Sequence, residues 1–300
     1  MLELPGLRRP QETGSVFPLK DNDIANLSRD QLIHALDAAP PLWENGGVRI
    51  VRVSSGVVVK YGSDVHIWEA ANMRFVAQHT NIRLPTVLDA WETNGESGHE
   101  DTICYIAMSY IRGQQLDEVW PTLSDASRCD IQQQLHQFIQ ELRLLKSDKP
   151  GPIGGGVSNG AFFTDYGAGP FVSQEDMERW FDGRLAVCRQ FGLVDQAQEG
   201  FRGLFRDLAM CHMDLHPRNI ILDGRGKVWL IDWAFAGMYP AYFETASILR
   251  NGWTTYFGDW LGQGDRARFG EEINRLFSIS FALTTGALCQ PTETTHDMTR

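Results

Sequence analysis

The sequence predicts an α+β protein, with a small strand-rich N-terminal part and a larger, mostly helical C-terminal part. Two observations support this fold class. Short runs of β-branched residues surround a Ser-Ser-Gly turn over residues 51–61, as expected for two paired strands. Apolar residues then recur at steps of three and four over residues 125–146, which indicates a long amphipathic helix that packs in a core.

The residues before about Leu42 are predicted to form an accessory arm, with one short helix over residues 28–36. The two strands that follow would end near Lys60. A helix is predicted over residues 65–78, with Ser63 or Asp64 as its N-cap.

Glu69 lies one turn into that helix, where its carboxylate could pair with Lys60. In isolation, a strand lysine and a helix glutamate are more often solvated surface residues. Their order along the chain, followed by the acidic motifs described below, favours the pairing. Residues 102–109 then read as a strand that runs into a linker, although the pattern alone fits a plain core strand equally well.

A glycine-rich stretch and the longer segment that contains it are interpreted separately. Residues 151–160 are rich in glycine but lack the Gly-Lys-Ser/Thr ending and the following helix of a phosphate-binding loop. We therefore expect an ordinary loop there. The whole segment 149–170 is long for a passive connection, and loops of this length often form lids or binding segments. We expect it to help frame a binding pocket.

The most informative segment is His212-Met213-Asp214-Leu215-His216-Pro217-Arg218-Asn219, which is followed by the apolar run that ends at Asp232. Asp223-Gly224-Arg225-Gly226 lies between the two and predicts a hairpin turn. Folding residues 220–222 back on residues 228–231 would bring Asn219 and Asp232 roughly opposite each other. A carboxylate and an amide oxygen suit Mg²⁺, which takes few protein ligands when phosphates supply the rest.

This arrangement predicts kinase-type phosphoryl transfer, in which the protein mainly positions groups and neutralises charge. Asp214 would accept a hydrogen bond from an acceptor hydroxyl and take its proton. His212 is expected to brace the loop, and Arg218 could pair either with Asp214 or with a phosphate. An Asp-x-x-x-x-Asn pattern alone is common by chance, and its combination with the second aspartate across a hairpin makes it informative.

The same residues carry a family resemblance. His-x-Asp-Leu-His-Pro-Arg-Asn followed by Ile-Asp-Trp-x-Phe-Ala-Gly resembles the aminoglycoside phosphotransferase and choline kinase-like superfamily, and in particular fungal proteins of the phosphotransferase enzyme family. The likeness runs from about Val48 to about Ala246. It implies a two-lobed protein-kinase-like fold, ATP and Mg²⁺ as cofactors, and a hydroxyl of a small molecule as acceptor.

The resemblance also assigns residues. Lys60 would contact the α- and β-phosphates with Glu69 fixing it, and backbone groups of Ser109 and Ile111 would bind the adenine edge. Asn219 and Asp232 would hold Mg²⁺. The implied division is an N-terminal arm (1–42), a nucleotide-binding N-lobe (43–109), a catalytic and acceptor-binding C-lobe (110–289) and a disordered tail (290–300).

Two departures bear on function. Met213 stands where the family usually has glycine, which suggests as an alternative a pseudokinase-like module that binds nucleotide with little or no turnover. No Gly-x-Gly-x-x-Gly precedes Lys60 and no Ala-Pro-Glu follows Asp232, which disfavours a protein kinase. Only Ser54-Ser55-Gly56 stands out as a turn to cover the phosphates.

Composition excludes several other classes. A net charge of −11 and a pI of about 5.2 argue against nucleic acid as a partner, because phosphate backbones bind basic surfaces. The same acidity modestly favours a cationic acceptor. No apolar run approaches the length that spans a membrane, and the N-terminus lacks a signal-peptide core. The 5 scattered cysteines predict reduced thiols in a cytoplasmic protein.

Overall fold

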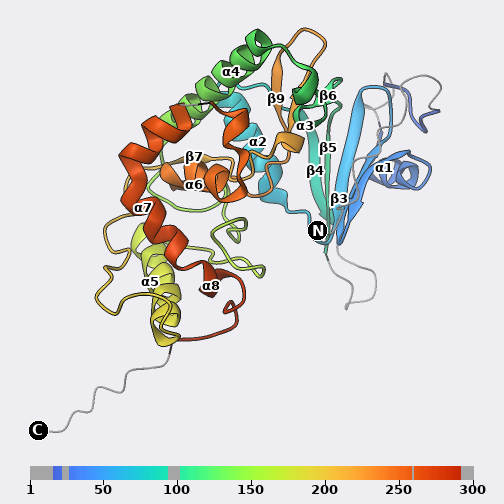
Figure 1. Cartoon of the computed structure of the whole chain (residues 1–300). Coiled ribbons are helices and arrows are strands. Elements are labelled where there is room, and N and C mark those ends of the chain that lie inside the picture. Colours follow the sequence, from blue (N-terminus) through green and yellow to red (C-terminus); the bar gives the residue numbers. More distant parts are fainter. Residues whose placement is uncertain (1–15, 22–26, 94–101, 259, 292–300) are drawn as a thin grey trace, which may run out of the picture. The chain divides into compact units, whose positions relative to one another are not determined.

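The structure is a computed structural model that describes residues 16–21, 27–93, 102–258 and 260–291 (Figure 1). The chain divides into two compact units. The first ends at Gln115 and also takes in Ile221–Ala234, whereas the second comprises Leu116–Ile220 and the residues from Phe235 onwards. The first unit is rich in strands and the second is mostly helical, so the predicted fold class is confirmed.

The first unit is built on a five-stranded antiparallel sheet with the order β1-β2-β3-β5-β4. Its strands are β1 (Pro41–Asn45), β2 (Val48–Arg52), β3 (Val57–Gly62), β4 (Val87–Thr93) and β5 (Ile103–Ser109). The two strands expected around the Ser-Ser-Gly turn are β2 and β3. Strand β1 and the Asn45-Gly46-Gly47 turn that joins it to β2 were not foreseen.

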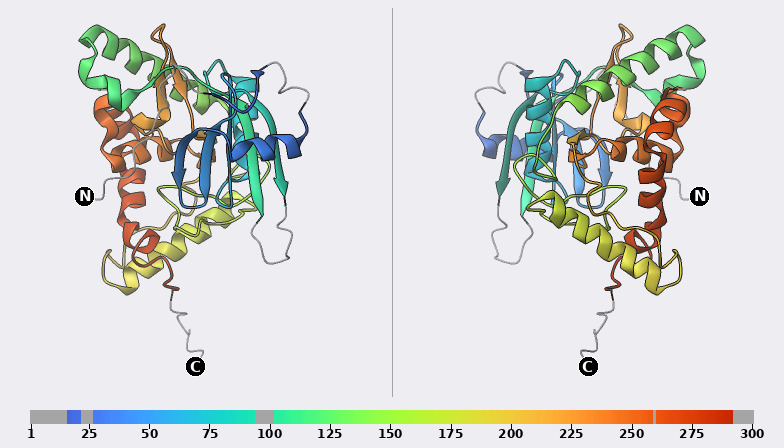
Figure 2. Two further views of the ribbon diagram at one scale, coloured as in Figure 1. Left: turned by 90° about the vertical axis from the view of Figure 1, so that its right-hand side faces the viewer. Right: turned by 90° about the vertical axis from the view of Figure 1, so that its left-hand side faces the viewer.

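Side chains of β3 alternate between the two faces of the sheet, and each face is covered by a different helix. Val57 and Val59 share a core with Leu32 and Leu36 of helix α1 (Arg29–Leu36). Lys60 belongs to the other set of alternating positions, because successive side chains of a strand point to opposite faces. That second face carries helix α2 (Ile67–His79), and the views in Figures 1 and 2 place α1 and α2 on opposite sides of the sheet.

The two helices begin differently. Helix α1 starts with a capping box, in which the Ser28 hydroxyl accepts from the backbone of Gln31 and the Gln31 side chain accepts from the backbone of Ser28. Its apolar residues join the sheet's core, so this part of the arm is integral to the first unit. The predicted N-cap of α2 was wrong: His66 holds that position without a side-chain bond. Asp64 instead accepts from the amide of Gly47, at 3.1 Å.

The second unit is organised around helices. They are α3 (Leu116–Val119), α4 (Asp125–Leu144), α5 (Gln174–Gln190), α6 (Tyr242–Asn251), α7 (Arg266–Ser278) and α8 (Ser280–Leu283), with a π-helical turn at Trp260–Asp265 and short 3₁₀ turns at Trp120–Thr122, Pro217–Asn219 and Trp253–Tyr256. Helix α4 confirms the predicted amphipathic helix. The buried side chains of its stripe are Ile131, Leu135, Phe138, Ile139 and Leu142.

The segment 149–170 forms a loop, as predicted, and part of it belongs to the core. Phe162 and Phe163 are buried against the aromatic rings of Phe181, Tyr239 and Phe243. In contrast, Tyr166 is 72% exposed. Burial of two of its three aromatic residues shows that this loop helps to build the second unit, and its role in framing a pocket stays a prediction.

Short strands deliver the acidic motifs. Strands β8 (Ile220–Leu222) and β9 (Val228–Leu230) are neighbours in a small sheet with β6 (Gln114–Gln115), and the amide of Asp223 donates to the carbonyl of Lys227 across the turn, at 3.0 Å. The predicted hairpin is therefore confirmed. In the second unit, β7 (Leu208–Cys211) pairs antiparallel with β10 (Gly237–Pro240), and β7 leads directly into His212.

Three further expectations concern the chain as a whole. None of the described helices combines the length and the hydropathy that crossing a membrane requires. The cysteines are free thiols, and Cys104, Cys188 and Cys211 are buried. Most of the predicted tail, residues 292–300, lies outside the described residues.

Candidate active site

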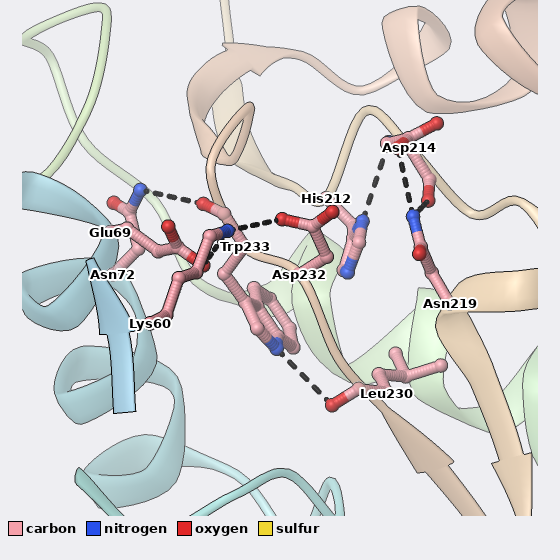
Figure 3. A network of polar contacts seen from close by, with 9 residues as sticks. All are labelled: Lys60, Glu69, Asn72, His212, Asp214, Asn219, Leu230, Asp232 and Trp233. Atoms are coloured by element: carbon pink, nitrogen blue, oxygen red, sulfur yellow. Dashed lines mark hydrogen bonds and ion pairs between the residues drawn. The ribbon is translucent and has the colours of Figure 1, made fainter. Parts of the chain in front are cut away.

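A buried ion cluster in the first unit surrounds Lys60. The Lys60 ammonium donates to Oε1 of Glu69 at 2.8 Å and to Oδ1 of Asp232 at 2.7 Å (Figure 3). The side chains of Lys60 and Glu69 are 6% and 2% exposed, whereas that of Asp232 is 42% exposed. The predicted pair of strand lysine and helix glutamate is therefore present, and Asp232 is its third member.

The charges in this cluster determine its protonation. Burial alone would lower the pKa of Lys60, but the attraction of Asp232 and Glu69 outweighs it and raises that pKa. Burial and the neighbouring Asp232 raise the pKa of Glu69, against the opposing effect of Lys60. Lys60 is thus a permanent cation between two acidic groups, and such a buried charge is tolerable only while it is paired.

The backbone around Asp232 is fixed by its neighbour Trp233. The Trp233 side chain is fully buried, and its indole N–H donates to the carbonyl of Leu230 at 3.3 Å. Asn72 of α2 donates to the carbonyl of Trp233 at 3.4 Å. Asp232 itself has a φ of +64°, a left-handed conformation that non-glycine residues rarely adopt. Strained residues of this kind cluster at functional sites.

In the second unit, Asp214 and Asn219 form a separate pair. The Asn219 amide donates to the Asp214 carboxylate at 2.8 Å and to the Asp214 carbonyl at 3.0 Å. The amide nitrogen therefore faces Asp214, and Figure 3 shows the amide oxygen of Asn219 turned away from it. Asp214 is half-buried. The five-residue spacing thus places the Asn219 amide nitrogen against the Asp214 carboxylate and leaves the amide oxygen directed away from Asp214.

Met213 adopts a φ of +68° and its side chain is buried. The Glu244 carboxylate accepts from the amides of His212 and Met213, the latter at 3.2 Å. The Ser247 hydroxyl donates to the carbonyl of Met213 at 2.8 Å. Helix α6 therefore holds Met213 in the backbone conformation that glycine adopts readily, so the loop reaches that shape despite the bulkier residue.

Glu244 is an unusual acid because it is fully buried in this setting. Burial raises its pKa to about 7, while the hydrogen bonds from His212 and Met213 oppose that rise and the charge of Asp214 adds to it. No local pattern indicates this role, since Glu244 lies 31 residues after Met213 and contacts it only in the folded chain. Ser247, one turn later in α6, was missed for the same reason.

His212 and Arg218 occupy positions next to Asp214. His212 is fully buried, and its Nδ1 accepts from the amide of Asp214 at 3.3 Å, an arrangement that suits bracing. The amide of Arg218 donates to Nδ1 of His216 at 2.9 Å. Burial and the charge of Arg218 lower the pKa of His216 to about 4. His216 is therefore neutral at physiological pH.

The end of β5 carries the residues expected at the hinge. The Ser109 amide donates to the carbonyl of Thr86 at 2.9 Å, and the Tyr110 amide donates to the carbonyl of Gly56 at 2.8 Å. Met108 is buried opposite Val58 of β3. Ile111 follows in the irregular segment that leads to β6.

Two turns of the first unit lie at opposite ends of strand β3. Ser54-Ser55-Gly56 lies at the Ser109 end of the sheet, because Val57 is opposite Ser109. The turn near Lys60 is Asn45-Gly46-Gly47. The carbonyl of Gly47 approaches Gly62 so closely that a Cβ atom there would lie 1.8 Å away, and Gly62 is two residues after Lys60. The Asn-Gly dipeptide is a strong hairpin signal that could have identified this turn from the sequence.

Among the described residues, no group of three or more His, Cys, Asp or Glu side chains is arranged to hold a metal ion. Asp232 belongs to the first unit and Asn219 to the second.

Known structures show which fold this is. A thermostable mutant of the aminoglycoside phosphotransferase APH(4)-Ia, in ternary complex with ADP and hygromycin B, is similar with a TM-score of 0.50 and 15% identity over 86% of this chain and 91% of that one. Its AMP-PNP and hygromycin B complex gives 0.50 and 15% over 85% and 89%, and its apo form gives 0.50 and 14% over 84% and 86%.

At these identities the likeness establishes the fold, which is the two-lobed protein-kinase-like fold that the motifs predict. No curated protein sequence matches the chain significantly. The sequence profile of the phosphotransferase enzyme family matches residues 44–277, a span that contains every candidate site residue described above. The chain therefore belongs to the phosphotransferase enzyme family.

Proposed function

We propose that this phosphotransferase is an ATP- and Mg²⁺-dependent kinase that transfers the γ-phosphate to a hydroxyl of a small molecule. Asp214 is the base, and Asn219 and Asp232 hold the metal. The observation that carries the proposal is the ion pair between Lys60 and Asp232, which lie 172 residues apart in the sequence. In protein kinases a strand lysine pairs with a helix glutamate, and an aspartate after the catalytic loop holds Mg²⁺; here the corresponding three residue types meet in one cluster.

The donor set fits Mg²⁺. The metal prefers oxygen ligands and usually binds through one or two protein groups, with substrate phosphates and water completing its shell. Asp232 provides a partly exposed carboxylate and Asn219 an amide oxygen, from the two ends of the β8–β9 hairpin. When bound, the ion would neutralise charge on the transferring phosphates. Lys60, a permanent cation, would bind phosphate oxygens while Glu69 keeps it oriented.

Asp214 is suited to accept the proton of the acceptor hydroxyl. Its carboxylate is held by the Asn219 amide, and its backbone is braced by His212. Glu244 and Ser247 fix the preceding residue, so the loop needs little rearrangement before it can act. Such prior positioning is a large part of the catalysis of phosphoryl transfer. Arg218 lies between the base and the metal ligand in sequence and would stabilise charge on a phosphate or on Asp214.

Support for the nucleotide comes from the related fold, whose structures include ADP and AMP-PNP complexes. We place the adenine beside Ser109 and Ile111. The amide of Ser109 already donates to Thr86, so the group that we assign to Ser109 is its carbonyl oxygen. The acceptor that we propose is a hydroxylated small molecule; the structure of the related phosphotransferase is a ternary complex with ADP and the small molecule hygromycin B. The net charge of −11 favours a cationic one.

Titration of wild-type protein with AMP-PNP, with and without Mg²⁺, tests the metal assignment. We expect Asp232→Asn to remove the stimulation of binding by Mg²⁺, and Asp214→Asn to retain it. In a coupled ADP-release assay over amino sugars, quaternary-amine alcohols and hydroxy amino acids, both variants should lose turnover. Asp223→Asn, in the turn of the same hairpin, is the control and should behave as wild type.

Retained turnover in Asp232→Asn would refute the metal assignment. The alternative of a nucleotide-binding module without turnover predicts Mg²⁺-dependent AMP-PNP binding by the wild type and no phosphorylated product from any acceptor. The positive φ of Met213 favours the active kinase over this alternative, because the hydrogen bonds with Glu244 and Ser247 hold the backbone of this methionine in a conformation that glycine adopts readily.

A further inference from the structure

The N-terminal segment 16–21 is attached to the turn between β2 and β3. The Asp21 carboxylate accepts from the hydroxyls of Ser54 and Ser55 and from the amide of Gly56, the last at 2.8 Å. The hydrogen bonds from Ser54 and Ser55 lower the pKa of Asp21, so the group is ionised at neutral pH. One carboxylate therefore satisfies three donors of a three-residue turn.

The segment holds the turn from a second direction through Arg52. The Arg52 guanidinium lies between two rings, 4.7 Å from the centroid of Phe17 and 3.7 Å from that of Tyr110. It also donates to the carbonyls of Ser54, at 3.2 Å, and Ser55, at 2.6 Å. Arg52 is almost fully buried. Cation–π contacts of a desolvated guanidinium are among the stronger ones.

Two more contacts complete the attachment. The amide of Leu19 donates to the carbonyl of Val53 at 3.0 Å, and the Leu19 side chain packs on the core between α1 and the sheet. Every second residue of this segment thus makes a different contact. The Phe17 ring lies against the Arg52 guanidinium, Leu19 pairs with the backbone and packs on the core, and the Asp21 carboxylate binds the turn. Residues 16–21 are therefore docked on the first unit through side-chain and backbone contacts.

The Ser54-Ser55-Gly56 turn is bonded to the segment that follows β5. The carbonyl of Gly56 accepts from the amide of Tyr110, and the Tyr110 ring covers Arg52. Tyr110 lies between Ser109 and Ile111, the two residues to which we assign adenine binding. A displacement of the turn would therefore be transmitted to the backbone on both sides of Tyr110.

We propose that Asp21 is a positioning residue for nucleotide binding: by fixing the Ser54-Ser55-Gly56 turn, it sets the backbone of residues 109–111 that receives the purine. This inference rests on the proposed function, because it assigns the purine to that backbone. Asp21 acts at the purine end only, since the turn that approaches Lys60 is Asn45-Gly46-Gly47. It should therefore influence the binding of the base and leave the binding of the polyphosphate unchanged.

The test compares three probes on the full-length chain by calorimetry: AMP-PNP with Mg²⁺, adenosine, and inorganic tripolyphosphate with Mg²⁺. In Asp21→Ala we expect Kd for AMP-PNP and for adenosine to rise by the same factor, about 3- to 10-fold, the size expected for the loss of one to two net hydrogen bonds. Kd for tripolyphosphate should stay within twofold. Asp21→Asn, which still accepts from Gly56 and one serine, should recover most of the affinity for both purine probes.

Asp89→Ala is the matched control. Asp89 is another carboxylate of the first unit that binds the N-terminal region, through Arg29 of α1 at 2.8 Å, but it contacts neither the turn nor Tyr110 in any described bond. Asp89→Ala removes a surface interaction comparable with that of Asp21 and should leave all three dissociation constants unchanged. A general loss of stability would instead weaken all three probes in both alanine variants.

The outcomes separate the two proposals. Equal Kd values for wild type and Asp21→Ala, or a rise for tripolyphosphate equal to that for adenosine, overturn the positioning role while the kinase assignment stands. A wild-type protein that binds none of the three probes overturns the proposed function and the inference with it.

Discussion

Met213 offers a direct test of the backbone conformation of the catalytic loop. Its φ of +68° costs a non-glycine residue about 1–2 kcal/mol, and its side chain is 1% exposed. Truncation of a buried methionine to alanine costs about 2–5 kcal/mol through lost burial and the cavity left behind. We therefore expect Met213→Ala to be destabilised by that amount, because the strain remains while the packing is lost.

Met213→Gly loses the same packing but releases the strain. We expect it to be about 1 kcal/mol more stable than Met213→Ala, since glycine adopts positive φ at little cost. Met210 of β7 is the matched control, because it is the same residue type, is also 1% exposed and is not among the positive-φ residues. There the order should reverse, with alanine more stable than glycine by about 0.5–1 kcal/mol.

Urea unfolding, followed by far-ultraviolet circular dichroism, measures the four differences in free energy. The reasoning fails if Met213→Gly is less stable than Met213→Ala by the margin found at Met210. In that case the left-handed conformation, and with it the explanation of how methionine replaces glycine here, would be wrong. The comparison within each pair also removes most of the uncertainty in the cavity cost, because alanine and glycine leave similar cavities.

Two further predictions concern the buried charges. Lys60→Met leaves Glu69 and Asp232 without their cation and should lower the free energy of unfolding by about 3–5 kcal/mol. The double variant Lys60→Met/Glu69→Leu should be more stable than Lys60→Met in the same urea experiment. An equal or lower stability of the double variant would contradict the pairing. The pKa of Glu244 is raised from 4.5 to about 7, so its contribution to stability is fully present below pH 4.5 and is lost as the pH rises to 7. Thermal unfolding at pH 5 and pH 7.5 should therefore show wild type losing more stability than Glu244→Gln across this interval, by about 2 kcal/mol; parallel pH profiles would show that folding does not raise the pKa of Glu244.

The parts of the site that follow from short stretches of sequence could be predicted. The β8–β9 hairpin and the helix that carries Glu69 each depend on spacing within a few residues. Strand alternation then brings Lys60 to the α2 face. These features are local, so turn signals and periodicity are sufficient to indicate them.

The parts that were missed depend on distant segments or on competing local signals. Glu244 reaches the loop only because α6 packs there, and no spacing rule connects it with Met213. Asp21 lies 33 residues before Ser54, so its binding to the turn could not be read from either segment. The α2 N-cap was misplaced because Asp64, a good capping residue by type, binds the amide of Gly47 instead. The Asn45-Gly46-Gly47 turn was not predicted because β1 contains no β-branched residue that would mark it as a strand.

The first unit is discontinuous, because Ile221–Ala234 joins it from far along the chain. A fragment that stopped at Gln115 would retain the five-stranded sheet but would lack β9, Asp232 and Trp233. Lys60 would then keep a single acidic neighbour. One crossover near Gln115 between two homologous proteins would therefore combine β1–β5 of one parent with the β8–β9 hairpin of the other inside a single compact unit. A chimera that takes the whole cluster from one parent requires the hairpin to be transplanted together with the N-terminal half.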